Sequence, residues 1–265
     1  MKRLMSTKGA TMLVLLDADM LCYRACASVE QEIDWGHDIW TLHVDLNEAK
    51  AKLEDMTEMI LTRGLDAMHF DGDYKVIFCF SSKHNFRKDL LSTYKLNRAT
   101  KRKPVGYHAL VKYVEDTYTA LTMDGLEADD CIGILATQPE NKDHSLIISG
   151  DKDLKCIAGY HYDFLRDEFS HVNDDEAYRH FLLQALMGDA TDGYTGCPKI
   201  GRVTAGKILD KDCSWKAVVG AYEKAGLSEA VALTQARVAK ILTATDYDLE
   251  AKKVKLWTPN ITTGA

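Results

Sequence analysis

The chain has 265 residues, 46% of them hydrophobic, which is typical of one large domain or two closely packed ones. Its net charge of −7 argues against a polyanionic partner unless the acids are concentrated in one place. The seven cysteines form no CxxC or CxxH pair, which disfavours a zinc site or a disulfide framework and favours the reducing cytoplasm. The apolar run near the start is too short for a membrane span and has no signal-peptide cleavage pattern, so we expect no membrane partner.

Three short apolar runs in the first 150 residues predict buried strands. They are rich in β-branched residues and show no polar alternation. Strands of this kind are usually parallel and covered on both faces by helices. The three predicted strands are residues 12–16, 76–80 and 145–149.

Apolar residues at helical spacing separate these strands. Residues 45–64 predict a helix with Asp45 as its N-cap and Gly64 as its end, and residues 107–121 predict another. The alternation indicates an α/β fold in which helices flank a central parallel sheet. After about residue 176 the pattern becomes helical, so we expect an α/β domain over 1–175 and a helical region over 176–265. The helices expected in that region are residues 176–187, 203–209, 214–225 and 228–244.

Acidic residues follow two of the three predicted strands, serines follow the third, and further acids stand in two later motifs, LEADD and GDATD. Taken singly, each group has an ordinary explanation as a helix cap, a turn or a helix end. Since the carboxyl ends of parallel strands meet at one edge of a sheet, the groups together predict one acidic site. Such a site suits two divalent cations that clamp a phosphodiester. The predicted metal ligands are Asp17, Glu127, Asp129, Asp130, Asp151, Asp153, Asp189 and Asp192.

This acidic set accounts for the whole net charge. Removing its eight members from the 40 acidic residues leaves 32, against 33 lysines and arginines. The rest of the surface is therefore free to meet a polyanion once the acids hold cations.

Residues 83–103 form a basic segment, with eight lysines and arginines against one acid, Asp89. A solvated helix and loop is the ordinary explanation. The interleaved aromatic residues favour a surface that follows a nucleic-acid strand, with cations for phosphates and aromatic rings for bases. The DNA-binding residues predicted here are Lys83, Arg87, Tyr94 and Lys103.

Residues 196–209 predict two helices joined by a tight glycine hairpin. Exposed backbone N–H groups and a helix N-terminus bind phosphate without regard to base sequence. We therefore expect this hairpin to seat duplex DNA through Gly196, Lys199, Gly201 and Thr204.

In this order and spacing, the motifs LVLLDADMLCYR, YKLNR, KPVGY, LEADD, IISGDKD and GDATDGYTGCPKIG resemble the flap-endonuclease superfamily of structure-specific 5′ nucleases. Within it the chain is most similar to the bacteriophage 5′→3′ exonucleases, and the resemblance covers nearly the whole chain. It implies a PIN-like nuclease body, an arch or clamp at about 83–103, and a helix-hairpin-helix module that binds duplex DNA. By position, Arg24, Lys95 and Arg98 match the family's catalytic residues that steer the phosphate.

The resemblance also implies an activity. Members of this superfamily hydrolyse phosphodiester bonds from a 5′ end with two Mg²⁺ ions, for which Mn²⁺ substitutes, and a potassium ion often sits at the hairpin. Their substrates are duplex DNA with a 5′ end, nick or flap, and RNA–DNA hybrids during primer removal in replication. No obligate protein partner is implied.

Two positions depart from the family pattern. Ser82 stands where members usually carry an aspartate after the second strand, which predicts weaker binding at one ion site. Lys199 stands where the hairpin usually has a glycine, which predicts a shifted turn or an added phosphate contact.

Two alternatives have other functions. Asp17 and Asp19, with the later Gly188-Asp189, suggest a phosphatase of the haloacid-dehalogenase type, although its spacing is not met and the basic segment stays unexplained. The other is a DNA-junction-binding protein that lost catalysis through Ser82. The balance between exonuclease and flap cleavage, and the oligomeric state, stay open.

Overall fold

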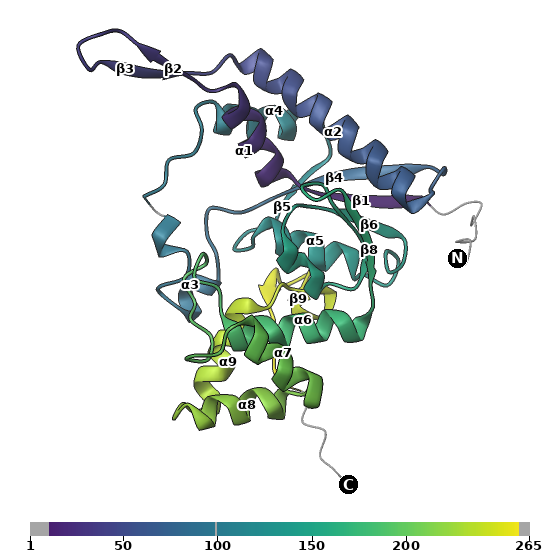
Figure 1. Cartoon of the computed structure of the whole chain (residues 1–265). Coiled ribbons are helices and arrows are strands. Elements are labelled where there is room, and N and C mark those ends of the chain that lie inside the picture. Colours follow the sequence, from purple (N-terminus) through teal and green to yellow (C-terminus); the bar gives the residue numbers. More distant parts are fainter. Residues whose placement is uncertain (1–10, 99, 260–265) are drawn as a thin grey trace.

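The computed structural model describes residues 11–98 and 100–259, and in this part of the chain a six-stranded sheet forms the centre (Figure 1). Its strand order is β5-β4-β1-β6-β7-β8. All neighbouring pairs are parallel except β7 and β8, which are antiparallel. The strands are β1 (Met12–Asp17), β4 (Tyr74–Phe80), β5 (Ala120–Thr122), β6 (Ser145–Ile148), β7 (Gly159–Asp163) and β8 (Glu168–Val172).

The predicted fold class is confirmed, and the three predicted strands are β1, β4 and β6. The sequence did not predict β5, β7 or β8. β5 has only three residues and was absorbed into the helical pattern of residues 107–121. β7 has the sequence Gly-Tyr-His-Tyr-Asp and is buried along its whole length. Its polar residues give no apolar pattern, so the sequence does not indicate a buried strand.

Helices cover both faces of the sheet. β1 sends alternate side chains to opposite sides, and on both sides these side chains are apolar. Val14 and Leu16 pack into the core beneath three of the helices, whereas Leu15 packs into the core beneath the others. The first group is α1 (Ala18–Val29), α2 (Leu46–Met68) and α4 (Tyr107–Thr117), and the second includes α5 (Ala128–Ala136).

In the α/β part of the chain, two predicted helix ends are wrong. α2 continues four residues past Gly64 and ends at Met68, and its C-cap His69 has a left-handed backbone with φ 55°. Gly64 lies inside the helix, where a Cβ would lie 3.2 Å from Ile148 and from Tyr162, so the glycine permits close packing on the sheet. α4 ends at Thr117 instead of residue 121, where the chain turns into β5.

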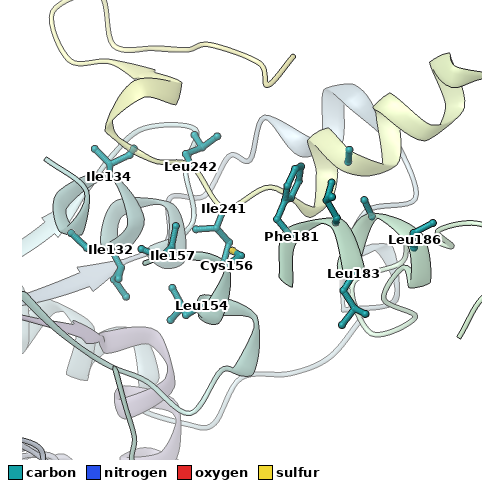
Figure 2. Close-up of a cluster of buried hydrophobic side chains, with 14 of the residues drawn as sticks. Ile132, Ile134, Leu154, Cys156, Ile157, Phe181, Leu183, Leu186, Ile241 and Leu242 are labelled. Atoms are coloured by element: carbon teal, nitrogen blue, oxygen red, sulfur yellow. The ribbon is translucent and has the colours of Figure 1, made fainter. Parts of the chain in front are cut away.

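The C-terminal region is helical, as expected, and it shares one hydrophobic core with α5 and the sheet. Figure 2 shows Ile132 and Ile134 of α5 and Phe181 and Leu186 of α6 in this cluster, with Cys156 and Ile241 between them. Because one core joins the two parts, the division at residue 175 stays a prediction. The last predicted helix ends at Ala239 instead of residue 244. The four helices are α6 (Asp174–Met187), α7 (Arg202–Lys211), α8 (Trp215–Lys224) and α9 (Glu229–Ala239).

Two further features stand outside the sheet. A hairpin of β2 (Gln31–Asp34) and β3 (Trp40–His43) projects from the body between α1 and α2, and the sequence did not predict it (Figure 1). The basic segment follows β4, contains the short helix α3 (Arg87–Leu90) and returns to α4; residue 99 lies outside the described part. None of the described helices has the length and apolar character needed to cross a membrane.

Candidate active site

The acidic site begins at the carboxyl ends of β1 and β6, which are neighbours in the sheet. Asp17 is buried and caps α1, with one carboxylate oxygen 3.2 Å from the Met20 N–H. Its other oxygen accepts a hydrogen bond of 3.0 Å from the Ser149 hydroxyl. Asp151 caps the 3-10 turn after β6 and accepts from the Asp153 N–H at 2.8 Å. Backbone capping therefore fixes these carboxylates before any ligand binds.

The N-terminus of α5 and the connection from α6 to α7 (residues 188–201) bring further acids to the same place. Glu127 is the N-cap of α5, and Asp129 lies in its first turn. Together with residues of the other two segments they surround a cavity of about 30 Å³. The carboxylates that line the cavity are Glu127, Asp129, Asp151, Asp153 and Asp192.

Cations from the basic segment contact two of these acids. The Lys95 ammonium group pairs with Glu127 and lies 3.4 Å from Asp192. Arg98 pairs with the other Asp192 oxygen. The Tyr94 hydroxyl donates to Glu127 at 2.7 Å. Both residues that the resemblance assigned to phosphate steering on this segment therefore reach the acidic site.

The carboxylates divide into two electrostatic classes. Burial, reinforced by neighbouring carboxylates, raises the pKa of Asp17 and of Asp153 to about 6. The same causes raise the pKa of Asp129 well above its usual value. Burial also acts on Glu127, but the charges of Lys95 and Arg87 outweigh it and lower the Glu127 pKa to about 2. In the first class, burial and neighbouring carboxylates outweigh the nearby cations, among them Lys152, which lies 3.6 Å from Asp153.

Two orphaned oxygen atoms show that the donor set fits a hard divalent cation. One oxygen of Asp153 and the side-chain oxygen of Gln184 are buried, accept no hydrogen bond, and belong to residues that line the cavity. The Asp153 oxygen has one charged neighbour, the Lys152 ammonium group at 3.6 Å. Oxygen donors with excess negative charge are what Mg²⁺ and similar ions prefer. Among residues 11–98 and 100–259, no three His, Cys, Asp or Glu side chains are already arranged to hold one ion.

Residues 12–181 match the family described as 5′-3′ exonuclease, N-terminal resolvase-like domain. The chain belongs to this family of 5′-3′ exonucleases. It is 27% identical to the exodeoxyribonuclease of Enterobacteria phage T3 and 26% identical to the exonuclease of Escherichia phage T7, with 93% of each chain covered in both cases. The predicted family and enzyme class are therefore confirmed.

The fold of this exonuclease is also found in solved structures. The bacteriophage T5 5′-exonuclease with bound zinc matches with a TM-score of 0.62 and 18% identity, over 89% of this chain and 90% of the other. A T5 flap endonuclease variant in complex with DNA and metal ions matches with a TM-score of 0.61 and 18% identity, over 88% and 89%.

The predictions for Arg87 and Asp130 are wrong. Arg87 is buried and donates to both Asp130 oxygens at 2.7 Å, so it cannot contact DNA. Asp130 also accepts from the backbone N–H groups of Glu127 and Leu242, at 3.1 and 3.0 Å. These four contacts use all the acceptor sites of a fully buried carboxylate, which leaves none for a metal. The pair instead fastens the basic segment to α5.

Two further DNA-contact predictions are wrong because the residues are buried. The Tyr94 ring packs against Tyr194 and Val238, so it is not available to stack on a base. The Gly196 N–H donates to the Gln235 side chain at 2.8 Å. A Cβ on Gly196 would lie 2.3 Å from the Gly188 nitrogen, so this glycine allows two backbone strands to touch.

The remaining predicted residues are placed as follows. Asp189 does not line the cavity, but its charge contributes to the raised pKa of Asp153 and Asp192. Arg24 is exposed on α1 and does not line the cavity. Lys83 and Lys103 are exposed on the basic segment.

Lys199, Gly201 and Thr204 are exposed at or just before the start of α7. The connection between α6 and α7, residues 188–201, is longer than the tight hairpin that the sequence predicted. Gly201 is the N-cap of α7, and no side chain caps this end. Thr204 lies in the first turn and is exposed. Lys199 has φ 64°, a left-handed conformation that glycine adopts more easily. The glycine expected from the family at this position therefore has a geometric reason.

Sequence reasoning missed Ser149 and Gln184. Ser149 orients Asp17 through its hydroxyl group. Gln184 lies on the buried side of α6, where an amide among leucines is an unusual residue. A polar side chain at a predicted core position was the available signal. Ser82, the residue that departs from the family pattern, donates to Asp124 at 3.3 Å.

Proposed function

We propose that this exonuclease hydrolyses phosphodiester bonds of duplex DNA from a 5′ end with two divalent ions bound at the acidic cavity. The observation that carries the proposal is the meeting of carboxylates from separate segments around one cavity, with burial raising the pKa of several of them. The DNA and metal ions in the T5 flap endonuclease complex, and the named activities of the phage T3 and T7 relatives, support it.

Mg²⁺ is the proposed ion, with Mn²⁺ as a substitute. Asp17, Asp129, Asp151 and Asp153 would hold the ions, and Glu127, Asp189 and Asp192 would act through water. Two bound ions would supply Lewis acidity at the scissile phosphate. The Ser149 hydroxyl orients Asp17 for this role.

The basic residues near the cavity orient the substrate. Lys95 and Arg98 already lie against carboxylates. When a phosphate enters the site, each of these two side chains would exchange its carboxylate partner for the phosphate. Lys83 and Lys103, exposed on the same segment, would guide the strand toward them. Arg24 on α1 is the proposed contact for a terminal phosphate.

Duplex DNA would rest on the start of α7. The uncapped N-terminus at Gly201, with Lys199 and Thr204 beside it, offers N–H groups and positive charge to a phosphate backbone. We propose that a potassium ion mediates part of this contact.

The proposed substrates are duplexes with a 5′ end, a nick or a flap, and RNA–DNA hybrids. Removal of primers and 5′ strands during phage DNA replication in the infected cell is the corresponding role. Cleavage of matched blunt, nicked, flapped and hybrid duplexes would rank these substrates.

Cleavage of a 5′-labelled duplex in the presence of Mg²⁺ tests the activity. We expect Asp151→Asn to lose most of the rate, because it removes a carboxylate from the cavity. Asp55→Asn is the matched control, since Asp55 is exposed on α2 and does not line the cavity. An intact substrate with the parent protein, or full activity of Asp151→Asn, would refute the proposal.

The same assay also distinguishes the proposed nuclease from a protein that binds DNA junctions without cleaving them. Binding of a junction without cleavage at saturating Mg²⁺ would indicate a protein that lost catalysis through Ser82. Family membership disfavours the phosphatase alternative, for which turnover of a small phosphomonoester would be needed.

A further inference from the structure

A second cavity shares no lining residue with the acidic site. It has a volume of about 310 Å³ and is lined by residues of α2, residues of β4, and Tyr118. Tyr74, the first residue of β4, lines it, whereas the acidic site lies at the carboxyl ends of the strands. This volume falls in the range of small-molecule sites.

The only charged side chains that line this cavity are Glu54 and Glu58. They lie four residues apart on α2, so their charges face the same side of the helix and repel each other. No ion pair involves either glutamate within the described residues. A cation between them would relieve the repulsion.

Two tyrosines hold Glu54 in place. The hydroxyl of Tyr113 and that of Tyr118, the latter at 3.3 Å, both donate to the same Glu54 oxygen. The second oxygen makes no hydrogen bond within the described residues, so it is available on a carboxylate whose orientation is already fixed.

The walls of the cavity are aromatic. The rings of Phe78 and Tyr118 pack with their centroids 5.1 Å apart, and Tyr74 is exposed at the rim. The Thr57 hydroxyl, from the same stretch of α2, is buried and has no hydrogen-bond partner. Aromatic faces attract organic cations, and an unpartnered hydroxyl can accept a hydrogen bond from an N–H group.

We propose that this cavity binds an organic cation, namely an alkylammonium or guanidinium group. Such a group pairs with the glutamates, lies against the aromatic walls and donates to Thr57. Mg²⁺ fits less well, because it prefers a shell of oxygen ligands and water to aromatic rings. The two negative charges also exclude a DNA phosphate, so the site is separate from the proposed nuclease function.

Calorimetric titration of the full chain with spermidine and, separately, with L-argininamide tests this site. We expect the double variant Glu54→Gln, Glu58→Gln to bind at least tenfold more weakly than the parent. Glutamine keeps an acceptor for the two tyrosines, so the fold is preserved. Asp55→Asn is the matched control, because it removes one charge from α2 outside the cavity and should leave the affinity unchanged.

The choice of probe identifies the source of the cation. Tighter binding of spermidine points to a free polyamine, and tighter binding of L-argininamide points to an arginine side chain; either supports the proposal. Tyr74→Ala should weaken both probes, since it removes an aromatic wall. DNA cleavage should be unchanged in all of these variants.

Three results would overturn the proposal. They are the absence of binding by both probes at millimolar concentration, equal weakening in Asp55→Asn, and MgCl₂ binding that the double variant weakens as much as it weakens binding of the organic cations. Loss of nuclease activity, by contrast, would bear only on the proposed function.

Discussion

The basic segment (residues 83–103) and the start of α7 are both cationic regions expected to meet DNA, but their side chains are used differently. In the basic segment, Arg87 and Lys95 are largely buried and pair with carboxylates. At the start of α7, Lys199 and Arg202 are exposed and form no ion pair within the described residues. The same residue types therefore hold the fold together in one region and remain available to a ligand in the other.

The basic segment also touches the connection that leads from α6 to α7. The Lys95 N–H donates to the Asp192 carbonyl at 2.7 Å, and the Thr93 hydroxyl donates to the Gly193 carbonyl at 3.0 Å. A Cβ on Gly193 would lie 2.4 Å from the Thr93 carbonyl oxygen, so only glycine allows this approach. The basic segment is thus fixed to the acidic site by its backbone as well as by its charges.

Arg87→Met should have the largest effect on stability. An unchanged free energy of unfolding would contradict the structural role assigned to Arg87. It leaves Asp130 charged, fully buried and without its cationic partner. The free energy of unfolding should fall by about 3–5 kcal/mol, measured by urea denaturation. Arg102→Ala is the control in the same segment, because its pair with Glu30 is solvent-exposed on the arginine side and its loss should change the unfolding free energy little.

Asp153→Asn and Glu127→Gln should change stability in opposite directions. Of these two residues, Glu127 pairs with cations of the basic segment and Asp153 does not, within the described part of the chain. The folded protein keeps a proton on Asp153 up to about pH 6, whereas the unfolded chain loses it near 3.8. The unfolding free energy therefore falls as pH rises through this window. In metal-free protein, the Asp153→Asn substitution should raise the unfolding free energy by about 1–2 kcal/mol at pH 7.5 and leave it unchanged below pH 4.

Glu127 has the reverse sign. Its pKa is about 2 in the folded protein and 4.5 ordinarily, so it stabilises the protein above pH 4.5 and loses this effect as pH falls toward 2. Glu127→Gln should therefore destabilise the protein at pH 7.5. Thermal unfolding between pH 3 and 8 measures both variants, and a shared sign would contradict the two electrostatic classes.

Lys199→Gly separates backbone strain from charge at the start of α7. Glycine relieves the left-handed conformation, so the free energy of unfolding should rise by up to about 1 kcal/mol. Loss of the charge should weaken DNA binding and reduce the slope of log affinity against log salt by about 0.9. Lys199→Ala is the control: it should show the same salt slope without the gain in stability.

Lys83→Ala should have the smallest effect on the fold. Lys83 is exposed in the basic segment, so the free energy of unfolding should change by less than about 0.5 kcal/mol. DNA affinity should still fall, with a reduced salt slope measured by fluorescence anisotropy. A large loss of stability would show that this residue belongs with Arg87 and not with Lys199.

The family was readable from the order of short motifs, and the parallel sheet was readable from three apolar runs, because both depend on local composition. The strands β5, β7 and β8 were not readable. Their residues are few or polar, and only pairing with neighbouring strands makes them strands.

The sequence by itself determined which carboxylates and which cations the protein has, and that the strand ends would gather them at one edge of a sheet. The tertiary structure decided how each was used. Asp130 and Asp129 are adjacent in the sequence, yet helix geometry turns one into the core toward Arg87 and the other toward the cavity. Charge is a property of a residue, but burial and partners are properties of the fold, and they separate a structural ion pair from a binding site.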